Sequence, residues 1–273
     1  MTLIYLFIIG LAIGSFLNVL IDRLPNEQSI MGRSHCDFCK HKLKGLDLFP
    51  VLSFIFLGGK CRYCHKKISW QYPLIEILTG ISFVLIFNPD LIGVNSQFSH
   101  LRQDFGGQAI FQLVAWLGIA SCLIVIFFAD VKYQIIPDSM QIAFFLFSLF
   151  INLLAPRSLG EVGEFGIWNL LKSGVVVMLP ILILYWLTKS RGMGFGDVKL
   201  AFVIGFLLGL KAGLLALYCS FILGALVGLI LIIFKLKKLK SKIAFGPFLI
   251  LGSIIIFIWQ SYIFKFIYQI YGF

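Results

Sequence analysis

Two aspartates lie at the edges of long apolar segments. Asp130 directly follows the apolar run 115–129, and Asp197 ends the segment Gly194-Phe195-Gly196-Asp197, just before another apolar run. A carboxylate at the edge of the membrane hydrocarbon is costly, so such residues usually face an internal cavity and have a function. Each aspartate alone could be a plain interfacial residue, and Asp197 could be a helix N-cap. Together, entering the same side of the membrane, they predict an aspartyl catalytic pair.

Four cysteines form a second cluster, in the segment 22–73. They are arranged as two Cys-x-x-Cys pairs, Cys36 with Cys39 and Cys61 with Cys64. This spacing is typical of a tetrahedral four-thiolate zinc site. A loop of this length has little core of its own, so the metal would provide much of its folding free energy. Disulfides and free thiols are the alternatives, and a cytoplasmic location disfavours disulfides.

Three histidines flank the cysteine pairs: His35, His41 and His65. Any of them could replace a cysteine as a metal ligand. Four well-spaced thiols already make a full set of ligands, so we expect the histidines to be solvated.

The composition is that of a membrane protein. Of the 273 residues, 60% are hydrophobic and only 13% are charged, and the mean hydropathy is +0.98. A soluble domain has about twice this charged fraction. The apolar segments are rich in Phe, Ile and Leu without alternation, which favours helices over barrel strands. The net charge of +11 lies mainly in the loops between these segments, and this distribution argues against a nucleic-acid partner.

The predicted fold is all-α: a polytopic membrane bundle of about eight transmembrane helices with a small zinc-binding cytoplasmic loop domain. The predicted spans are 3–21, 74–89, 108–129, 139–155, 166–187, 198–210, 212–234 and 247–268. The predicted domains are the first transmembrane helix (1–21), the cytoplasmic loop (22–73) and the bundle that carries the aspartates (74–273). The short sixth span is expected to be a broken or tilted helix, or to form a hairpin with the seventh around Lys211-Ala212-Gly213.

The charge distribution predicts the orientation in the membrane. With the N-terminus outside, the inside segments are 22–73, 130–138, 188–199 and 235–246, and they hold most of the 23 Lys and Arg residues. This asymmetry predicts that both termini are outside and that both aspartates lie at the cytoplasmic face. The first span has no basic start and no small-residue cleavage pattern, so we expect it to be retained. Gly10 and Gly14, four residues apart, favour close packing of this helix.

Further motifs accompany the aspartates and the cysteines. They are Gly14-Ser15-Phe16-Leu17-Asn18-Val19 with Arg23-Leu24-Pro25, Asp47-Leu48-Phe49-Pro50-Val51-Leu52-Ser53, Tyr72-Pro73-Leu74-Ile75-Glu76, Ile136-Pro137-Asp138, Gly194-Phe195-Gly196-Asp197-Val198-Lys199 and Phe245-Gly246-Pro247-Phe248. In this order, and over nearly the whole chain, they resemble the type IV prepilin peptidases, which are bifunctional leader peptidases and N-methyltransferases of the bacterial membrane. Many members have Asn-Ile-Pro where this chain has Leu48-Phe49-Pro50, in a segment associated with methyl transfer.

The resemblance implies that Asp130 and Asp197 share one proton and activate a water for peptide hydrolysis. Two close carboxylates in a low-dielectric site cannot easily both ionise, so one holds a proton and the other acts as the base. We assign the base role to Asp197, because a helix N-terminus favours an ionised carboxylate. The implied substrate is a prepilin or pseudopilin precursor with a short basic leader and a long apolar helix. The implied methyl donor is S-adenosylmethionine, although the chain has no glycine-rich Rossmann fingerprint.

Three residues near the aspartates are predicted to support them. Gly194 and Gly196 let the backbone turn sharply and approach a substrate strand, because they have no Cβ. Asp138 follows Pro137 and is expected to cap the fourth span rather than to act as a third catalytic carboxylate.

Glu76 lies just inside the second span, where a carboxylate without a partner is expensive. Lys66, Lys67 or Lys199 could form an ion pair with it. Alternatively, Glu76 could help to hold a methyl donor or a substrate amine. Lys199 could equally extend its ammonium group to the membrane interface.

Two other functions fit parts of the sequence. A cation- or proton-coupled transporter would use the paired aspartates to carry an ion through the bundle, and it predicts midplane carboxylates and two related halves. Here the carboxylates lie at span ends, and no internal repeat is found. A non-catalytic scaffold that docks a partner on the zinc module would leave the aspartates without a purpose. Whichever of these functions the protein has, membrane lipid is expected beside the basic loops.

Overall fold

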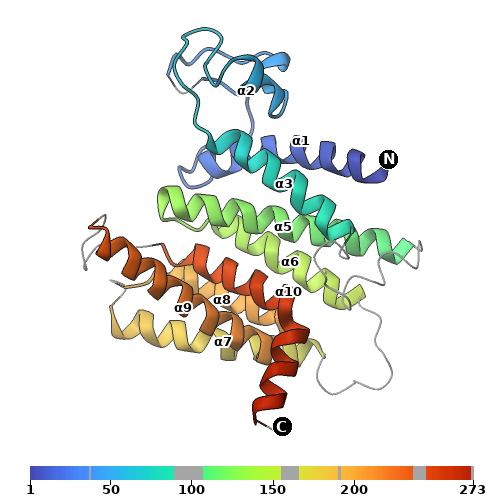
Figure 1. Cartoon of the computed structure of the whole chain (residues 1–273), viewed down its shortest axis with the longest axis vertical. Helices are drawn as coiled ribbons and strands as arrows, with labels where there is room; N and C mark the ends of the chain where they lie inside the picture. The colour runs from blue at the N-terminus through green and yellow to red at the C-terminus, as the bar shows by residue number, and fades with distance from the viewer. Residues whose placement is uncertain (37, 89–106, 155–165, 190–191, 236–243, 272–273) are drawn as a thin grey trace. The chain divides into compact units, whose positions relative to one another are not determined.

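The computed structural model describes residues 1–36, 38–88, 107–154, 166–189, 192–235 and 244–271 (Figure 1). The helices are α1 (Thr2–Arg23), the 3-10 helix η1 (Gly45–Leu48), α2 (Leu52–Phe56), α3 (Gln71–Phe87), α5 (Gly107–Tyr133), α6 (Asp138–Leu154), α7 (Ile167–Leu187), α8 (Phe195–Leu208), α9 (Leu210–Ile233) and α10 (Gly246–Tyr271). In the described residues the only β-type pairing consists of two isolated bridges, so the all-α prediction is confirmed.

Each predicted span corresponds to one of the longer helices. Within the described residues, four helices are long and apolar enough to cross a membrane: Thr2–Arg23, Ile110–Tyr133, Ile167–Leu187 and Leu210–Ile233. Shorter apolar helices are formed by Gln71–Phe87, Asp138–Leu153 and Gly246–Gln260. The total of eight crossings therefore stays a prediction.

The chain forms two compact units, which we describe separately. Of the described residues, those up to Val125 form the N-terminal unit, and those from Ile126 onward form the C-terminal unit. The boundary falls within α5. The four cysteines of the Cys-x-x-Cys pairs belong to the first unit, and Asp130 and Asp197 belong to the second. The predicted domain boundaries after residues 21 and 73 stay a prediction.

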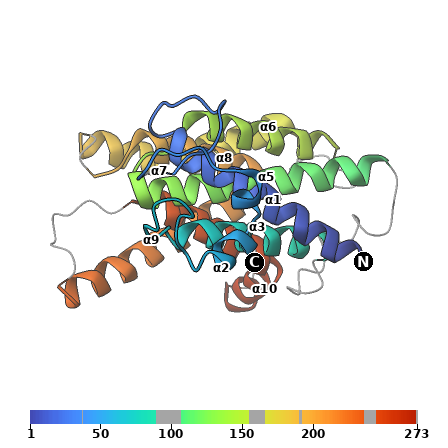
Figure 2. The ribbon, with the colours of Figure 1, turned by 90° about the horizontal axis from the view of Figure 1, so that it is seen from above.

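In the N-terminal unit, α1 and α3 pack side by side (Figures 1 and 2). A Cβ added to Gly10 would lie 2.6 Å from Gly80 Cα, and one added to Gly14 would lie 2.7 Å from Glu76 Cα. Only glycine permits such an approach of two backbones, as in small-residue contacts between membrane helices. The close packing expected from Gly10 and Gly14 is confirmed.

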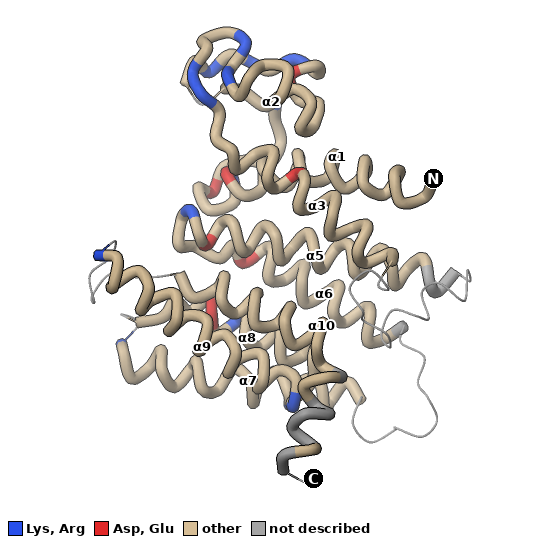
Figure 3. Tube along the Cα trace, viewed as in Figure 1, with Lys and Arg blue, Asp and Glu red and all other residues tan. Residues whose placement is uncertain are grey.

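Residues 24–70, here called the cysteine module, connect α1 to α3. The module holds η1, α2 and the four cysteines, and Lys and Arg residues gather on it (Figure 3). Its large apolar side chains are mostly exposed, including Phe49 at 56% and Phe56 at 85%. The module therefore lacks a sizeable apolar core, as the sequence predicts.

In the C-terminal unit, α8 contacts α6, α7, α9 and α10. More than half of the residues of α8 are buried, including Leu200, Ala201 and Phe206. The chain turns between α8 and α9 at Gly209, whose φ of +79° is readily adopted only by glycine. The hairpin predicted around Lys211-Ala212-Gly213 thus turns slightly earlier, and those three residues already belong to α9.

Candidate active site and metal centre

Asp130 and Asp197 are both buried in the C-terminal unit. Asp130 lies in the last turn of α5 and is 5% exposed, and Asp197 lies in the first turn of α8 and is 6% exposed. The charge of Asp130 acts directly on Asp197, so the two carboxylates form one electrostatic site. Neither carboxylate has a Lys or Arg partner among the ion pairs of the described residues.

A helix N-terminus holds each aspartate. The Gly194 N–H, at the start of α8, donates a hydrogen bond of 3.1 Å to Asp197 Oδ2. The Gly246 N–H, at the start of α10, donates to the Asp130 carboxylate. Both carboxylates thus receive the partial positive charge of a helix terminus. The argument that singled out Asp197 as the base therefore no longer discriminates between the two aspartates.

One oxygen of each aspartate remains without a hydrogen-bond partner. These atoms are Asp130 Oδ2 and Asp197 Oδ1, and both are fully buried. Buried carboxylate oxygens are normally hydrogen-bonded, since leaving one without a donor costs about 1–3 kcal/mol or more. The site is therefore polar and incomplete in two places, which suits a water molecule or a substrate group that supplies the missing donors.

Two glycines leave the space around the aspartates. A Cβ on Gly246 would lie 2.6 Å from Asp130 Oδ2, and one on Gly196 would lie 3.1 Å from Ile136 Cβ. Ile136 also lies within 3.1 Å of a Cβ on Gly246, so this side chain packs between the two glycines. Gly194 has no such restriction, because its nearest neighbour would be Asp197 Oδ2 at 3.5 Å. Sequence reasoning missed Gly246 as a donor, since nothing local pairs it with Asp130.

Two side chains of α6 contact the first turn of α8. Gln141 Nε2 donates a hydrogen bond of 2.9 Å to the Gly196 carbonyl oxygen. Asp138 lies in the first turn of α6, where the sequence placed it, and its Oδ1 accepts a 2.8 Å ion pair from Lys199. Sequence reasoning missed Gln141, although a buried amide inside an apolar span is a recognisable signal.

Glu76 has backbone and hydroxyl partners. Its Oε2 accepts a 2.7 Å hydrogen bond from the Val51 N–H, and the Ser15 hydroxyl also donates to this carboxylate. Val51 has a φ of +59°, which is strained for a β-branched residue. Glu76 therefore fixes an unfavourable turn of the cysteine module onto α3. Of the three lysines considered as partners of Glu76, Lys199 pairs with Asp138 instead.

The structure brings the four cysteines of the module together. Their sulfur atoms all lie within 4.8 Å of one another, and Cys36 Sγ lies 3.8 Å from Cys64 Sγ. Tetrahedral zinc with bonds of about 2.3 Å to sulfur requires sulfur–sulfur distances of about 3.8 Å. Hydrogen bonds from the Cys64 and Tyr63 N–H groups outweigh burial and lower the pKa of the Cys61 thiol to about 7. The donor set thus fits a metal ion that binds thiolates, and the cluster contains no histidine among the described residues.

The two cysteine pairs have the same backbone geometry. In the first, the Cys36 N–H bonds to the His41 carbonyl oxygen, and Lys40 has a φ of +57°. In the second, the Cys61 N–H bonds to the Lys66 carbonyl oxygen, and His65 has a φ of +55°. In each turn the first cysteine also accepts a backbone hydrogen bond, from Lys40 in the first pair and from His65 in the second, so both pairs lie in matching tight turns, as expected of metal-binding knuckles.

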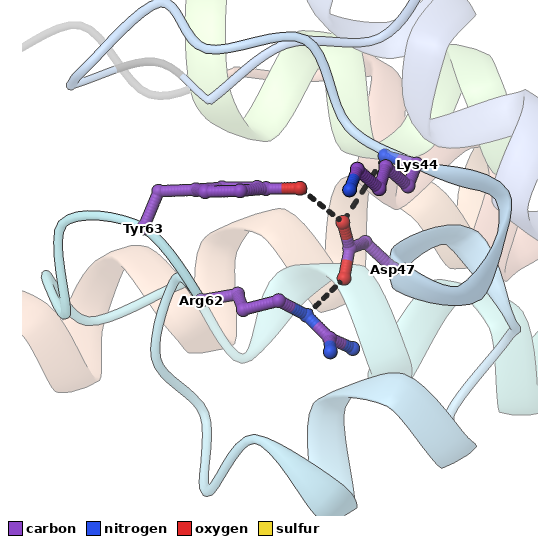
Figure 4. A network of polar contacts seen from close by, with 4 residues as sticks. All are labelled: Lys44, Asp47, Arg62 and Tyr63. Atoms are coloured by element: carbon purple, nitrogen blue, oxygen red, sulfur yellow. Dashed lines mark hydrogen bonds and ion pairs between the residues drawn. The ribbon is translucent and has the colours of Figure 1, made fainter.

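A polar network ties the second pair to η1 (Figure 4). Asp47 Oδ1 accepts a 2.7 Å bond from Arg62 Nε, and Asp47 Oδ2 accepts from the Lys44 N–H at 3.1 Å and the Tyr63 hydroxyl at 3.4 Å. Burial opposes ionisation of Asp47, but these donors outweigh it and hold its pKa below the usual value. The network stabilises the module independently of the metal.

Comparisons with known proteins agree with this division of the chain. Residues 8–89 match the bacterial peptidase A24 N-terminal domain, and residues 117–229 match the type IV leader peptidase family. The prepilin leader peptidase/N-methyltransferase of Bacillus subtilis (strain 168) is 31% identical over 96% of both chains. The proteins of the same name from Aeromonas hydrophila (29% identical, 93% of this chain and 89% of the relative) and Xanthomonas campestris (30% identical, 93% and 90%) are similar.

No solved structure matches this chain. The apolar helices and the relatives together indicate a bacterial inner-membrane protein. Two family models cover the cysteine module and the aspartate site in turn, and a relative at 31% identity spans nearly the whole length. The chain therefore belongs to the type IV leader peptidase family.

Proposed function

We propose that this protein removes the leader peptide from type IV prepilin-like precursors at the membrane, and that it then N-methylates the new N-terminus. The relatives are named for these two activities, and both family models match. The observation that supports the peptidase most directly is the aspartate site. Two buried carboxylates lie in one electrostatic site. Each carboxylate accepts a hydrogen bond from a glycine N–H, and each has one buried oxygen that is left for another donor.

In the proposed reaction, Asp130 and Asp197 share one proton. The ionised carboxylate takes a proton from a water molecule as the water oxygen attacks the scissile carbonyl carbon, while the protonated carboxyl donates to the carbonyl oxygen. The tetrahedral intermediate then collapses: the C–N bond breaks, the leaving amine takes the proton that came from the water, and the proton on the former carbonyl oxygen returns to the carboxylate that supplied it. The two unpartnered oxygens, Asp130 Oδ2 and Asp197 Oδ1, are the atoms available for these transfers.

The helix N-termini have a separate role in this proposal. Gly194 and Gly246 supply fixed donors that need no reorganisation during the reaction, so they hold the negative charge of the pair in place. The absence of a Cβ on Gly246 lets its backbone approach the Asp130 carboxylate, and the absence of a Cβ on Gly196 makes room for Ile136. Charge distribution supports a site at the cytoplasmic face with both termini outside.

We further propose that the cysteine module binds one structural zinc ion through Cys36, Cys39, Cys61 and Cys64. Bound zinc would fix the two knuckles against each other and would take no part in peptide hydrolysis. S-adenosylmethionine supplies the methyl group in the second activity. The described residues contain no glycine turn between a strand and a helix, so we assign no residue to this methyl donor.

The transporter alternative has no support from the comparisons, which match a peptidase family over most of the chain. The decisive experiment is mass spectrometry of a purified prepilin precursor after incubation with the purified protein in detergent or nanodiscs. Release of the leader, and a further mass gain of one methyl group only with S-adenosylmethionine, would support both activities. An intact precursor in the presence of folded, metal-loaded protein would contradict the peptidase proposal.

A further inference from the structure

Gln141 is a buried polar side chain next to the aspartate site that the reaction above does not use. It lies on α6, it is 3% exposed, and its Nε2 donates to the Gly196 carbonyl oxygen over 2.9 Å. Its other amide atom, Oε1, is buried without a partner. An apolar side chain of the same length would fill this place without an unsatisfied oxygen. Stability alone therefore does not explain why an amide lies at this position, and its one hydrogen bond needs another explanation.

The bond joins the two parts of the chain that carry the aspartates. Asp130 lies near the end of α5, and only residues 134–137 separate α5 from α6. Gly196 directly precedes Asp197 at the start of α8. Gln141 thus provides a buried hydrogen bond between α6, which follows the end of α5 that carries Asp130, and the start of α8, which carries Asp197.

A second contact between the same helices differs in kind. The Asp138–Lys199 ion pair also links α6 to α8, but its side chains are 65% and 40% exposed. Exposed ion pairs hold geometry weakly because water competes for both groups. A buried amide with a short bond to a backbone carbonyl has no such competitor, so it constrains the α8 turn more strictly.

We propose that Gln141 is a positioning residue that sets where Asp197 lies relative to Asp130, through its hydrogen bond to Gly196. The inference rests on the proposed aspartyl peptidase function. Gln141 contacts neither the carboxylates nor the reacting atoms in this role. Its removal should therefore lower the rate of the chemical step and leave substrate binding and methyl transfer unchanged.

The test is Gln141→Met, which keeps the length of the side chain and removes the donor. Leader release from a prepilin precursor by full-length protein in nanodiscs should show kcat lower by about 10–100-fold, because a small misplacement of a catalytic group has an effect of this size. KM should stay the same, as should methylation of a pre-cleaved pilin. The matched control is Asn152→Leu on the same helix, since Asn152 Nδ2 bonds only within α6, to the Ser148 carbonyl oxygen at 2.8 Å.

Gln141→Glu provides a readout that a purely structural role would not affect. The introduced carboxyl can donate to the Gly196 carbonyl oxygen when protonated but not when ionised. The nearby titrating or charged groups are Asp130, Asp197 and the Asp138–Lys199 pair. Each rate is divided by that of the unaltered enzyme at the same pH, so that the titration common to both proteins cancels. The ratio should rise as the pH falls for Gln141→Glu and stay constant for Gln141→Met.

Three results would overturn the proposal. They are an unchanged kcat in Gln141→Met, a parallel loss of cleavage and methylation, and a rate ratio for Gln141→Glu that does not depend on pH. Failure of the proposed function would be seen differently, as continued cleavage by Asp130→Asn or Asp197→Asn. The two failures are therefore distinguishable in one set of assays.

Discussion

The cysteine module and the helical C-terminal unit both bury aspartates, but they treat them differently. Asp47 in the module has a donor on each oxygen, from Arg62 on one side and from Lys44 and Tyr63 on the other. Asp130 and Asp197 each keep one buried oxygen without a donor. The same residue type thus serves as a saturated structural link in one unit and as an incomplete site in the other. Incomplete hydrogen bonding of this kind is expected where a substrate or water supplies the missing donors.

The difference between the structural aspartate Asp47 and the incompletely bonded pair is tested most directly by changing Asp130 and Asp197. Asp130→Asn or Asp197→Asn should each lower leader release by at least about 10²–10⁴-fold, because an amide cannot exchange the proton that the pair must share. The thermal unfolding temperature should stay equal or rise, since each change removes a buried charge that is incompletely bonded. Leader release is followed by mass spectrometry, and unfolding by circular dichroism. Appreciable cleavage by either folded variant would remove that residue from the mechanism.

The second prediction concerns the metal ligands. Cys36→Ser with Cys39→Ser should remove about one zinc ion per chain and should reduce methylation of a pre-cleaved pilin more than it reduces leader release. The physical reason is that the ligands and the aspartates belong to different compact units. Elemental analysis measures the zinc content, and the two activities are assayed on separate substrates. Equal losses in a variant with intact helices would show that the module also shapes the peptidase site.

The third prediction tests the saturated carboxylate. Asp47→Asn should destabilise the cysteine module by about 1–3 kcal/mol, because it weakens bonds from Arg62, Lys44 and Tyr63 in a side chain that is only 3% exposed. Cleavage should change little. The measurement is denaturant-induced zinc release, and Asp138→Asn is the control because its ion pair is exposed. Zinc release at the same denaturant concentration as in the unaltered protein would contradict the structural role.

Asp47 also predicts a dependence on pH. Its pKa is lower in the folded protein than in the unfolded chain, so its contribution to stability is present above the ordinary value of 3.8. That contribution is lost as the pH falls through the lowered folded pKa. The difference in stability between the unaltered protein and Asp47→Asn should therefore shrink below about pH 4. A difference that stays constant down to strongly acidic pH would show that the carboxylate charge is not what stabilises the module.

The smallest effect is expected at the exposed ion pair. Lys199→Gln should change the free energy of unfolding by no more than about 0.2–1 kcal/mol, because the partners are 40% and 65% exposed. Added salt should shift the unaltered protein toward the variant. Unfolding curves at low and high ionic strength make this comparison. A loss of leader release far beyond this small change in stability would assign Lys199 a direct part in the site.

Much of the fold follows from local sequence features. Continuous apolar segments predicted the helices, the Cys-x-x-Cys spacing predicted a cluster of four sulfurs, and Gly10 with Gly14 predicted a close helix contact. Each of these features is defined by residues only a few positions apart along the chain. The structures that they predict depend on the same local spacing. The roles of Asp130 and Asp197 in catalysis remain predictions, but the burial of both residues in the C-terminal unit is observed.

The details missed by sequence reasoning depend on contacts between distant segments. The Gly246 N–H reaches Asp130 across more than one hundred residues of chain, and Gln141 reaches Gly196 across 55. The positive φ of Val51 becomes explicable only when Glu76 is seen to accept its N–H. No spacing rule encodes such pairs, because they depend on how the helices pack.

The glycine contacts between α1 and α3 have a consequence for the length of chain that the cysteine module can have. They fix the two ends of residues 24–70 near each other through packing that involves neither the metal nor the module itself. The entropy of closing a loop between fixed ends grows slowly, by only about 0.6 kcal/mol for each doubling of length. The module can therefore be regarded as an insertion in a helical hairpin. Shortening it to a brief linker should leave the α1–α3 pair intact while removing whatever the cysteines contribute.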